Sequence, residues 1–223
     1  MGQISPTTSP AAAAEESIVY VIDDDRLMLG ALSTLFRSIE LGVRTFSTAT
    51  EFLQHALPAL PSCLVLDIRM PRMSGLDLQA ELGRLGINIP VIFITGHGDI
   101  SMSVSAMKAG AVDFLTKPFR DQEMVDAVTA ALQRDLRRRS EEKFHSEMQA
   151  RFASLTRRER QIMGFVTSGL MNKQVAARIG ISEPTVKIHR GNLVRKMHAR
   201  SLAELVLIAE RLGVRDTTGS SHD

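Results

Sequence analysis

Short apolar runs of the β type alternate with stretches of helical spacing from Ser17 onward. The runs lie at residues 18–22, 43–46, 63–66, 91–94 and 112–115. Helical spacing is clearest at Met28, Leu32, Leu35 and Ile39, and Thr48 with Glu51 has the spacing of a capping box. Five strands that alternate with helices predict a parallel sheet covered by helices on both faces.

The pattern becomes purely helical after about Asp121. An apolar stripe at Val125, Val128, Leu132 and Leu136 leads into a charged run over 137–142, and similar spacing resumes at Phe144, Met148, Phe152 and Leu155. One long helix with a solvated, charged middle is the simpler interpretation. A hinge or a dimerising linker is the alternative.

Helices continue through the last third of the chain. Capping-box spacing recurs at Thr156 with Glu159 and at Ser201 with Glu204, and Gly169 and Gly180 lie where glycine ends a helix. These signals predict a compact four-helix unit. We therefore expect an α/β domain over 17–136, a helical linker over 137–153, a helical domain over 154–215, and disordered tails over 1–16 and 216–223.

The composition is globular, with 44% hydrophobic and 23% charged residues. The single cysteine, Cys63, cannot form an internal disulfide, and no Cys/His cluster has the spacing of a structural zinc site. No apolar run approaches the ~20 residues of a membrane helix, and the first residues lack a signal-peptide pattern. We expect a cytoplasmic protein.

Charge is divided unevenly along the chain. Residues 17–136 carry 10 Lys and Arg against 14 Asp and Glu, whereas residues 151–215 carry 13 against 4. A basic domain that follows an acidic one indicates a polyanionic partner for the second, and nucleic acid is the first candidate.

Polar residues follow the strands at the edge where an open parallel sheet binds ligands. Asp23, Asp24 and Asp25 follow the first strand, Asp67 ends the third, Thr95 ends the fourth, and Lys117 follows the fifth. Alone, each is typical of a helix cap, a turn or a surface lysine. Together they favour Mg²⁺, which prefers oxygen ligands, and an aspartate beside a metal ion and a lysine can attack a phosphoryl group.

Four motifs at these strand ends resemble the receiver domain of bacterial response regulators. They are Val21-Ile-Asp23-Asp24-Asp25, Leu66-Asp67-Ile-Arg69-Met70-Pro71-Arg-Met-Ser-Gly75, Ile94-Thr95-Gly96 and Phe114-Leu-Thr-Lys117-Pro118-Phe119. The resemblance covers residues 17–136 and implies a flavodoxin-like fold with strand order 2-1-3-4-5. It also implies a cis bond between Lys117 and Pro118.

The resemblance assigns roles to these residues. It implies that Asp67 accepts a phosphoryl group from a histidine kinase and that Thr95 and Lys117 bind phosphoryl oxygens. The implied Mg²⁺ ligands are Asp23 through water, Asp24, Asp67 and the backbone carbonyl of Arg69. Phe114 is implied as an aromatic switch, although a plain core phenylalanine is the alternative. Arg69 and His97 are implied to tune the lifetime of the phosphoryl group.

The basic helical unit resembles the LuxR-type helix-turn-helix of the NarL/FixJ subfamily. The motifs are Leu155-Thr156-Arg157-Arg158-Glu159, Gly169-Leu170-Met171-Asn172-Lys173 and Ile181-Ser-Glu-Pro-Thr185-Val186-Lys187-Ile188-His189-Arg190. Projection of the helix after Ser182 places Val186, Leu193 and Met197 on the core side and Ile188, Asn192 and Arg195 opposite. Expected DNA contacts are Lys173, Thr185, Lys187, Ile188, Arg190, Asn192 and Arg195. Gly191 departs from the basic residue common in that family, and His189 is expected to pack.

These features predict a DNA-binding transcriptional regulator of a two-component system, not an enzyme. Expected partners are a histidine kinase, promoter DNA, a second copy on phosphorylation through the face of the fourth helix, fifth strand and fifth helix, and RNA polymerase if the protein is an activator. One alternative is DNA binding that is independent of phosphorylation. A phosphatase working through an aspartyl phosphate and a flavodoxin-like cofactor binder are the others. The sequence names neither the signal nor the operator.

Overall fold

The computed structural model describes residues 17–96 and 100–214. The chain divides into two compact units, Met1–Arg139 and Ser140–Asp223. The tails expected at 1–16 and 216–223, and the expected tuning residue His97, lie outside the described residues. Within the described part of the chain, no helix has both the length and the apolar character needed to cross a membrane.

The first unit contains a five-stranded parallel sheet in the order β2-β1-β3-β4-β5, as predicted. The strands are β1 (Ile18–Ile22), β2 (Gly42–Phe46), β3 (Ser62–Asp67), β4 (Val91–Thr95) and β5 (Asp113–Thr116). Strands β1, β3 and β4 are almost wholly buried, whereas the edge strand β2 is largely exposed. The central strands therefore hold the residues at their ends in fixed positions.

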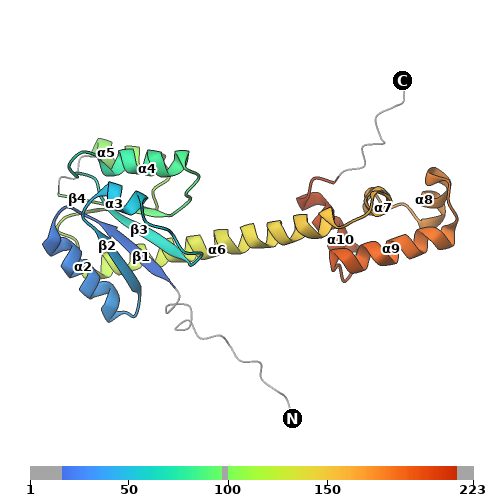
Figure 1. Ribbon diagram of the computed structural model, residues 1–223, viewed down its shortest axis with the longest axis horizontal. Helices are drawn as coiled ribbons and strands as arrows, with labels where there is room; N and C mark the ends of the chain where they lie inside the picture. The colour runs from blue at the N-terminus through green and yellow to red at the C-terminus, as the bar shows by residue number, and fades with distance from the viewer. Residues whose placement is uncertain (1–16, 97–99, 215–223) are drawn as a thin grey trace, which may run out of the picture. The chain divides into compact units, whose positions relative to one another are not determined.

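Helices cover both faces of this sheet (Figure 1). One face packs against α2 (Arg26–Ser38) and the first part of α6 (Asp121–Ala153). The other face packs against α3 (Ala49–Leu53), α4 (Gly75–Arg84) and α5 (Ile100–Lys108). The apolar runs predicted to be strands thus bury side chains on both sides, which is the pattern of a doubly covered parallel sheet.

Two predicted capping boxes differ in their details. At Ser201, which caps α10 (Leu202–Arg211), the Glu204 carboxylate accepts from the backbone N–H of Arg200 at 2.7 Å instead of that of Ser201. Thr48 caps α3 by accepting a hydrogen bond from the Glu51 backbone N–H at 3.2 Å. The Glu51 carboxylate, however, accepts from the backbone N–H of Ser47 at 3.1 Å and not from that of Thr48. The spacing therefore identified both caps correctly but not the reciprocal partners, which lie one residue earlier.

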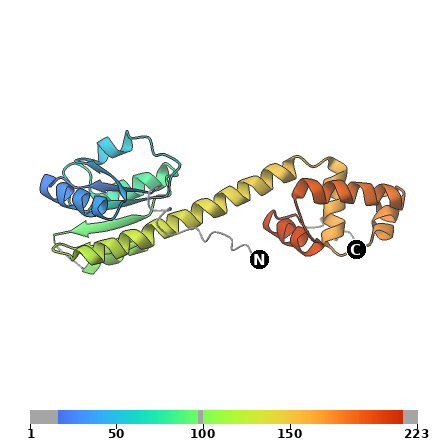
Figure 2. The ribbon, with the colours of Figure 1, turned by 90° about the horizontal axis from the view of Figure 1, so that it is seen from below.

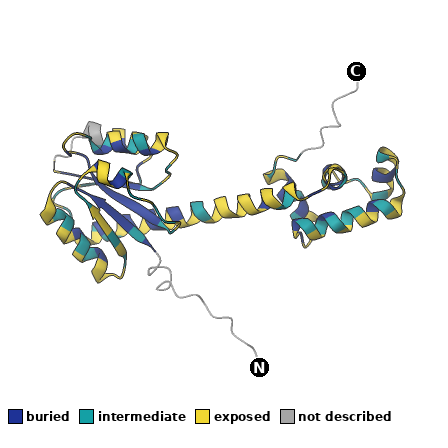
Figure 3. Ribbon diagram, viewed as in Figure 1, coloured by how far each residue is buried: buried dark blue, intermediate teal, exposed yellow. Residues whose placement is uncertain are grey.

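Helix α6 spans 33 residues, in agreement with the one-helix interpretation (Figure 2). Its charged middle is mainly exposed (Figure 3). The predicted apolar stripe is wrong at its end, because Leu136 is 45% exposed and Asp135 is fully buried instead. The buried face follows Met124, Val128 and Ala131 to Asp135, so a carboxylate completes it.

The buried carboxylate of Asp135 is satisfied by three donor residues. It accepts from the backbone N–H of Ser62 at 2.9 Å, which ties α6 to the first residue of β3. It also accepts from Nε of Arg138 at 3.1 Å and Nε of Arg139 at 2.6 Å. Buried carboxylates require such charge-assisted partners, which explains why two residues of the charged run are only half-exposed.

The second unit has its own apolar core, made by α7 (Arg157–Thr167), α8 (Asn172–Ile179), α9 (Glu183–Met197) and α10 (Leu202–Arg211) with the end of α6. Gly180 ends α8 at a positive φ of 67°, and Gly169 follows α7 at 87°, as their positions predicted. Ser182 caps α9 by accepting from the Thr185 N–H. Two short helices joined by a glycine turn, the helix-turn-helix order, are thus present.

An ion pair between a buried glutamate and a half-buried lysine joins the beginning of α7 to the end of α9. Thr156 and Glu159 form the predicted capping box. Glu159 is only 3% exposed, and its carboxylate also accepts from Nζ of Lys196 at 2.7 Å. Burial raises the pKa of Glu159, but the hydrogen bonds from Lys196 and Thr156 outweigh burial and hold this pKa below its ordinary value of 4.5.

The second unit should therefore lose stability in acid through Glu159. Because the folded-state pKa is lowered, the stabilisation is present above pH 4.5 and is lost as the pH falls through the folded-state value. We expect Glu159→Gln to lower the unfolding free energy by about 2 kcal/mol near neutral pH and by much less in acid. Calorimetry of the full chain at several pH values measures this difference, with the exposed Glu210→Gln as the control. A difference that does not change with pH would contradict the assignment.

Candidate functional site

The carboxyl ends of the parallel strands bring the predicted acidic residues together. Asp23 and Asp24 follow β1, and Asp67 is the last residue of β3. Asp23 and Asp67 are 1% and 5% exposed, while Asp24 is exposed. One carboxylate oxygen from each of the three lies within 4.8 Å of the others. The parallel register therefore converts residues far apart in the sequence into one carboxylate cluster.

Asp25, in contrast, has a structural role as a helix cap. Its side chain accepts from the Leu27 backbone N–H at 2.8 Å and caps α2. Its own backbone N–H donates to Oδ1 of Asp23 at 2.9 Å. The helix-cap interpretation thus holds for the third aspartate of the run, and this cap helps to fix the first.

Lys117, which follows β5, reaches into the cluster. Its Nζ lies 2.6 Å from Oδ2 of Asp23 and 3.2 Å from Oδ1 of Asp67. The lysine is half-buried, so its charge faces the two carboxylates with little intervening water. The Lys117–Pro118 bond is cis, as the sequence predicted.

The charged groups of the cluster shift one another's pKa values. Burial raises the pKa of Asp67 above its ordinary value; Lys117 opposes this shift, and Asp23 and Asp24 add to it. Burial works to lower the pKa of Lys117, but Asp23 and Asp67 outweigh it and raise that pKa. Lys117 thus contacts two of the three carboxylates, and the cluster retains an excess of negative charge.

This donor set fits a divalent cation such as Mg²⁺. Its oxygens come from carboxylates alone, they lie close enough to share one ion, and an exposed member leaves the site open to water. The backbone passes close to the end of β3, because a Cβ on Gly75 would lie 2.5 Å from the Asp67 carbonyl oxygen. The sequence motif included this glycine but did not reveal its reason.

Two further predicted residues lie on the strands β4 and β5. Thr95, the last residue of β4, is fully buried. Phe114 is half-buried in β5, pairs in register with Phe93 of β4 and packs on the sheet face that α3–α5 cover. Both are placed where a change at Asp67 can reach β4 and β5. Arg69 is exposed just beyond Asp67.

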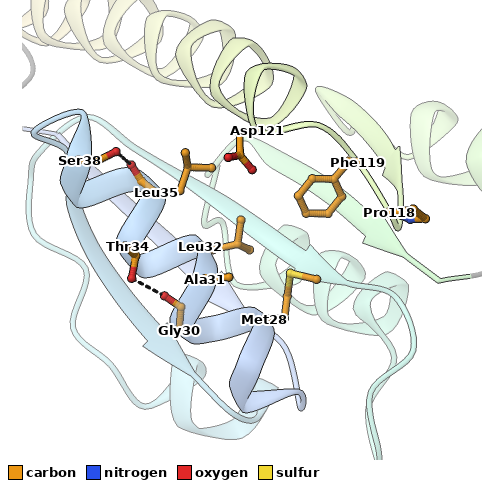
Figure 4. A pocket seen from close by; sticks show the side chains of 10 residues that line it. All are labelled: Met28, Gly30, Ala31, Leu32, Thr34, Leu35, Ser38, Pro118, Phe119 and Asp121. Atoms are coloured by element: carbon orange, nitrogen blue, oxygen red, sulfur yellow. Dashed lines mark hydrogen bonds between the residues drawn. The ribbon is translucent and has the colours of Figure 1, made fainter.

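An apolar pocket of about 640 Å³ lies between α2 and the residues that follow Lys117. Met28, Leu32 and Leu35 of α2 face Pro118 and Phe119 across it (Figure 4). The neighbouring Leu27 is 84% exposed. An exposed apolar surface next to a reactive group is typical of a protein docking site.

In the second unit, α9 has the two faces predicted for it. Val186, Leu193 and Met197 are fully buried. Ile188 is 65% exposed, and Lys187, Arg195 and, on α8, Lys173 are exposed as well. Thr185, Asn192 and His189 are half-buried. An exposed isoleucine flanked by cations is suited to the edges of base pairs in a DNA groove.

Internal hydrogen bonds hold several of these side chains. Arg190 Nη1 donates to Oδ1 of Asn172 at 3.0 Å and so connects α9 with the first residue of α8. Arg195 Nη2 donates to Oδ1 of Asn192 at 2.9 Å. Sequence reasoning missed Asn172, and no periodic signal marks it. A Cβ on Gly191 would meet open space, so the glycine is not demanded by packing.

Comparison with known families divides the chain into two parts, as the distribution of charge does. The family "Response regulator receiver domain" matches residues 19–129. The family "Bacterial regulatory proteins, luxR family" matches residues 153–218. These are a signalling module and a DNA-binding module rather than an enzyme.

Similar proteins span nearly the whole chain. Nodulation protein W of Bradyrhizobium diazoefficiens is 54% identical over 202 residues, which cover 91% of this chain and 89% of that protein. Transcriptional regulatory protein FixJ of Azorhizobium caulinodans is 44% identical, covering 88% and 93%. Among solved structures, response regulator StyR has a TM-score of 0.82 and 46% identity, covering 88% and 99%.

We expect Mg²⁺ to stabilise the first unit by relieving repulsion among the three carboxylates. At a free concentration a hundred times the dissociation constant, the gain is about 2.7 kcal/mol. Asp24→Asn should remove most of it, whereas Asp25→Asn, a change at the helix cap, should leave it intact. Thermal unfolding of the full chain with and without Mg²⁺ measures the gain. Equal gains in the two variants would contradict a site built on Asp24.

Proposed function

Because this chain belongs to the two-component response regulators of the NarL/FixJ subfamily, which join a receiver domain to a LuxR-type helix-turn-helix, we propose that phosphorylation of Asp67 controls its binding to promoter DNA. A histidine kinase is the donor. The receiver domain then comprises residues 17–136, the linker 137–153 and the DNA-binding domain 154–215. The family matches and the division after Arg139 support these limits.

The observation that carries the proposal is the contact of a nearly buried Asp67 with Lys117 inside a carboxylate cluster. In the transfer step a carboxylate oxygen of Asp67 attacks the phosphorus of a phosphohistidine. The bond from phosphorus to nitrogen breaks, and the imidazole keeps the electron pair. Lys117 offsets the charge on the phosphoryl oxygens, and Asp23 holds this lysine in reach.

Mg²⁺ bound by Asp23, Asp24, Asp67 and the backbone carbonyl of Arg69 would supply further charge neutralisation at the phosphoryl group. In our proposal Thr95 then donates its hydroxyl to a phosphoryl oxygen, and Phe114 turns into the space that Thr95 leaves. The burial of Thr95 and the half-burial of Phe114 on the adjacent strand support this order. The product is an altered surface over α5, β5 and α6.

The kinase docks on the pocket between α2 and Phe119. A helix of the kinase that covers Leu27 and fills this pocket would bring its histidine to the mouth of the cluster, since Pro118 is next to Lys117. The apolar lining supplies affinity, and the nearby carboxylates supply orientation.

The altered α5-β5-α6 surface pairs two phosphorylated copies. Val104 and Met107 of α5 are 45% and 47% exposed, which supports an apolar contact there. A symmetric pair matches two half-sites of an operator. Ile188 touches thymine methyl groups in the major groove, while Lys173 and other cations contact phosphates. Activation of transcription through RNA polymerase is the output we favour.

DNA binding that is independent of phosphorylation is the competing hypothesis. It treats the first unit as a scaffold and leaves the shared contacts of Lys117, Asp23 and Asp67 without a use. The two hypotheses differ in whether phosphorylation of Asp67 changes the affinity of the chain for DNA.

Incubation with acetyl phosphate and Mg²⁺ should add one phosphoryl group to the wild-type chain and none to Asp67→Asn. The intact mass measures the adduct. Asp25→Asn, which keeps a side-chain cap on α2, should still react. An adduct on Asp67→Asn, or none on the wild type, would refute Asp67 as the acceptor.

Two substitutions separate the expected DNA contacts. Ile188→Ser should cost about 1–3 kcal/mol of discrimination between the preferred sequence and a variant that lacks the contacted thymine, with an unchanged salt dependence. Lys173→Ala should weaken binding to all sequences alike and reduce the salt slope by about 1. Fluorescence anisotropy at several salt concentrations tests both. A reversed pattern would mean that the two roles are wrongly assigned.

A further inference from the structure

Asp135 connects the strand that carries Asp67 to the helix that leaves the first unit. We propose that Asp135 is a positioning residue for signal output. Its hydrogen bond to Ser62 makes α6 move together with β3, so that a displacement of β3 on phosphorylation of Asp67 is passed to the DNA-binding unit through α6. This inference rests on the proposed function. It adds a second route to the altered α5-β5-α6 surface.

Strand β3 is suited to carry displacement from one end to the other. All six of its residues, from Ser62 to Asp67, are buried, and it pairs with a strand on each side. Asp67 is at its carboxyl end, and the Ser62 N–H that donates to Asp135 is at its amino end. The ends are about 17 Å apart at the rise of an extended chain. A paired, fully buried strand shifts as a unit because its neighbours leave no room for bending.

The contact at Asp135 resists being broken. The carboxylate is 0% exposed, so loss of the Ser62 donor would leave part of a charged group without a partner and without water. Moving β3 while α6 stays in place therefore costs more than moving both. Of the polar contacts described between α6 and the sheet, this one joins a backbone group of β3 directly to the helix.

Arg138 and Arg139 connect Asp135 to the next turn of α6. Arg138 and Arg139 lie one turn beyond Asp135 and donate back to it at i+3 and i+4. They hold the helical turn that ends at the limit of the first unit, Arg139. Helix α6 continues without interruption to Ala153, and Met148 on it belongs to the core of the second unit. A displacement imposed at Asp135 thus enters a helix that both units bury.

The test compares phosphorylation-dependent DNA affinity among full-length variants. The probe is a DNA duplex selected from a random-sequence pool by the phosphorylated wild-type chain. Asp135→Asn removes the charge that holds the two arginines and leaves one oxygen for Ser62. Arg139→Gln is a milder change to the same contact. Asp126→Asn, an exposed carboxylate on the same helix, is the matched control.

For each variant the ratio of the dissociation constants without and with acetyl phosphate is measured, together with the intact mass of the adduct. We expect a ratio of about 5–150 for the wild type and the control. For Asp135→Asn we expect normal adduct formation and a ratio below about 2. A merely structural role would lower thermal stability or shift both dissociation constants equally, and would leave the ratio unchanged.

The outcomes are separable. A wild-type ratio near 1 refutes the proposed function, and the inference fails with it. A normal wild-type ratio with a normal ratio in Asp135→Asn refutes the inference alone. If Asp135→Asn does not form the adduct, Arg139→Gln decides: a reduced ratio with a normal adduct supports the inference, and a wild-type ratio overturns it.

Discussion

Repulsion among three carboxylates at the end of a parallel sheet is the constraint on which the rest of the receiver depends. Asp23 and Asp67 are nearly buried, and Lys117 is the cation that reaches both. Burial raises the pKa of Asp67, the charges of Asp23 and Asp24 add to this shift, and Lys117 opposes it. Such a site is poised to respond to a cation or a phosphoryl group, because either one redistributes charge that the fold holds close together.

The surrounding fold keeps these charges in place. The register of β1 and β3 sets Asp23 and Asp67 side by side, the Asp25 cap fixes the loop after β1, and Gly75 permits the backbone to pass close to Asp67. Asp135 fastens the opposite end of β3 to α6. In the second unit, too, a buried carboxylate has a charged partner, since Glu159 binds the half-buried Lys196 and so joins α7 to the end of α9. In both units a satisfied buried charge fixes the position of a helix.

The sequence predicts the layout well because the dominant signals are local or periodic. Strand runs, the caps at Thr156 and Ser182, and the acidic and lysine positions at strand ends are of this kind. The burial of Asp135 was not predicted, because a charged residue beside a basic run is normally solvated. No local pattern shows that the backbone N–H of Ser62 lies within hydrogen-bond distance of its carboxylate. The bond between Arg190 and Asn172 was missed for the same reason: it depends on how two helices cross.

Our main proposal is that charge at Asp67 sets the affinity of the second unit for DNA. Its most direct test is the equilibrium affinity of the full chain for a DNA duplex selected from a random pool, with and without beryllofluoride, a mimic that binds an aspartyl carboxylate as a phosphoryl group does. The account predicts tighter binding with beryllofluoride in the wild type and no change in Asp67→Asn. Equal affinity of the wild type under both conditions would contradict it.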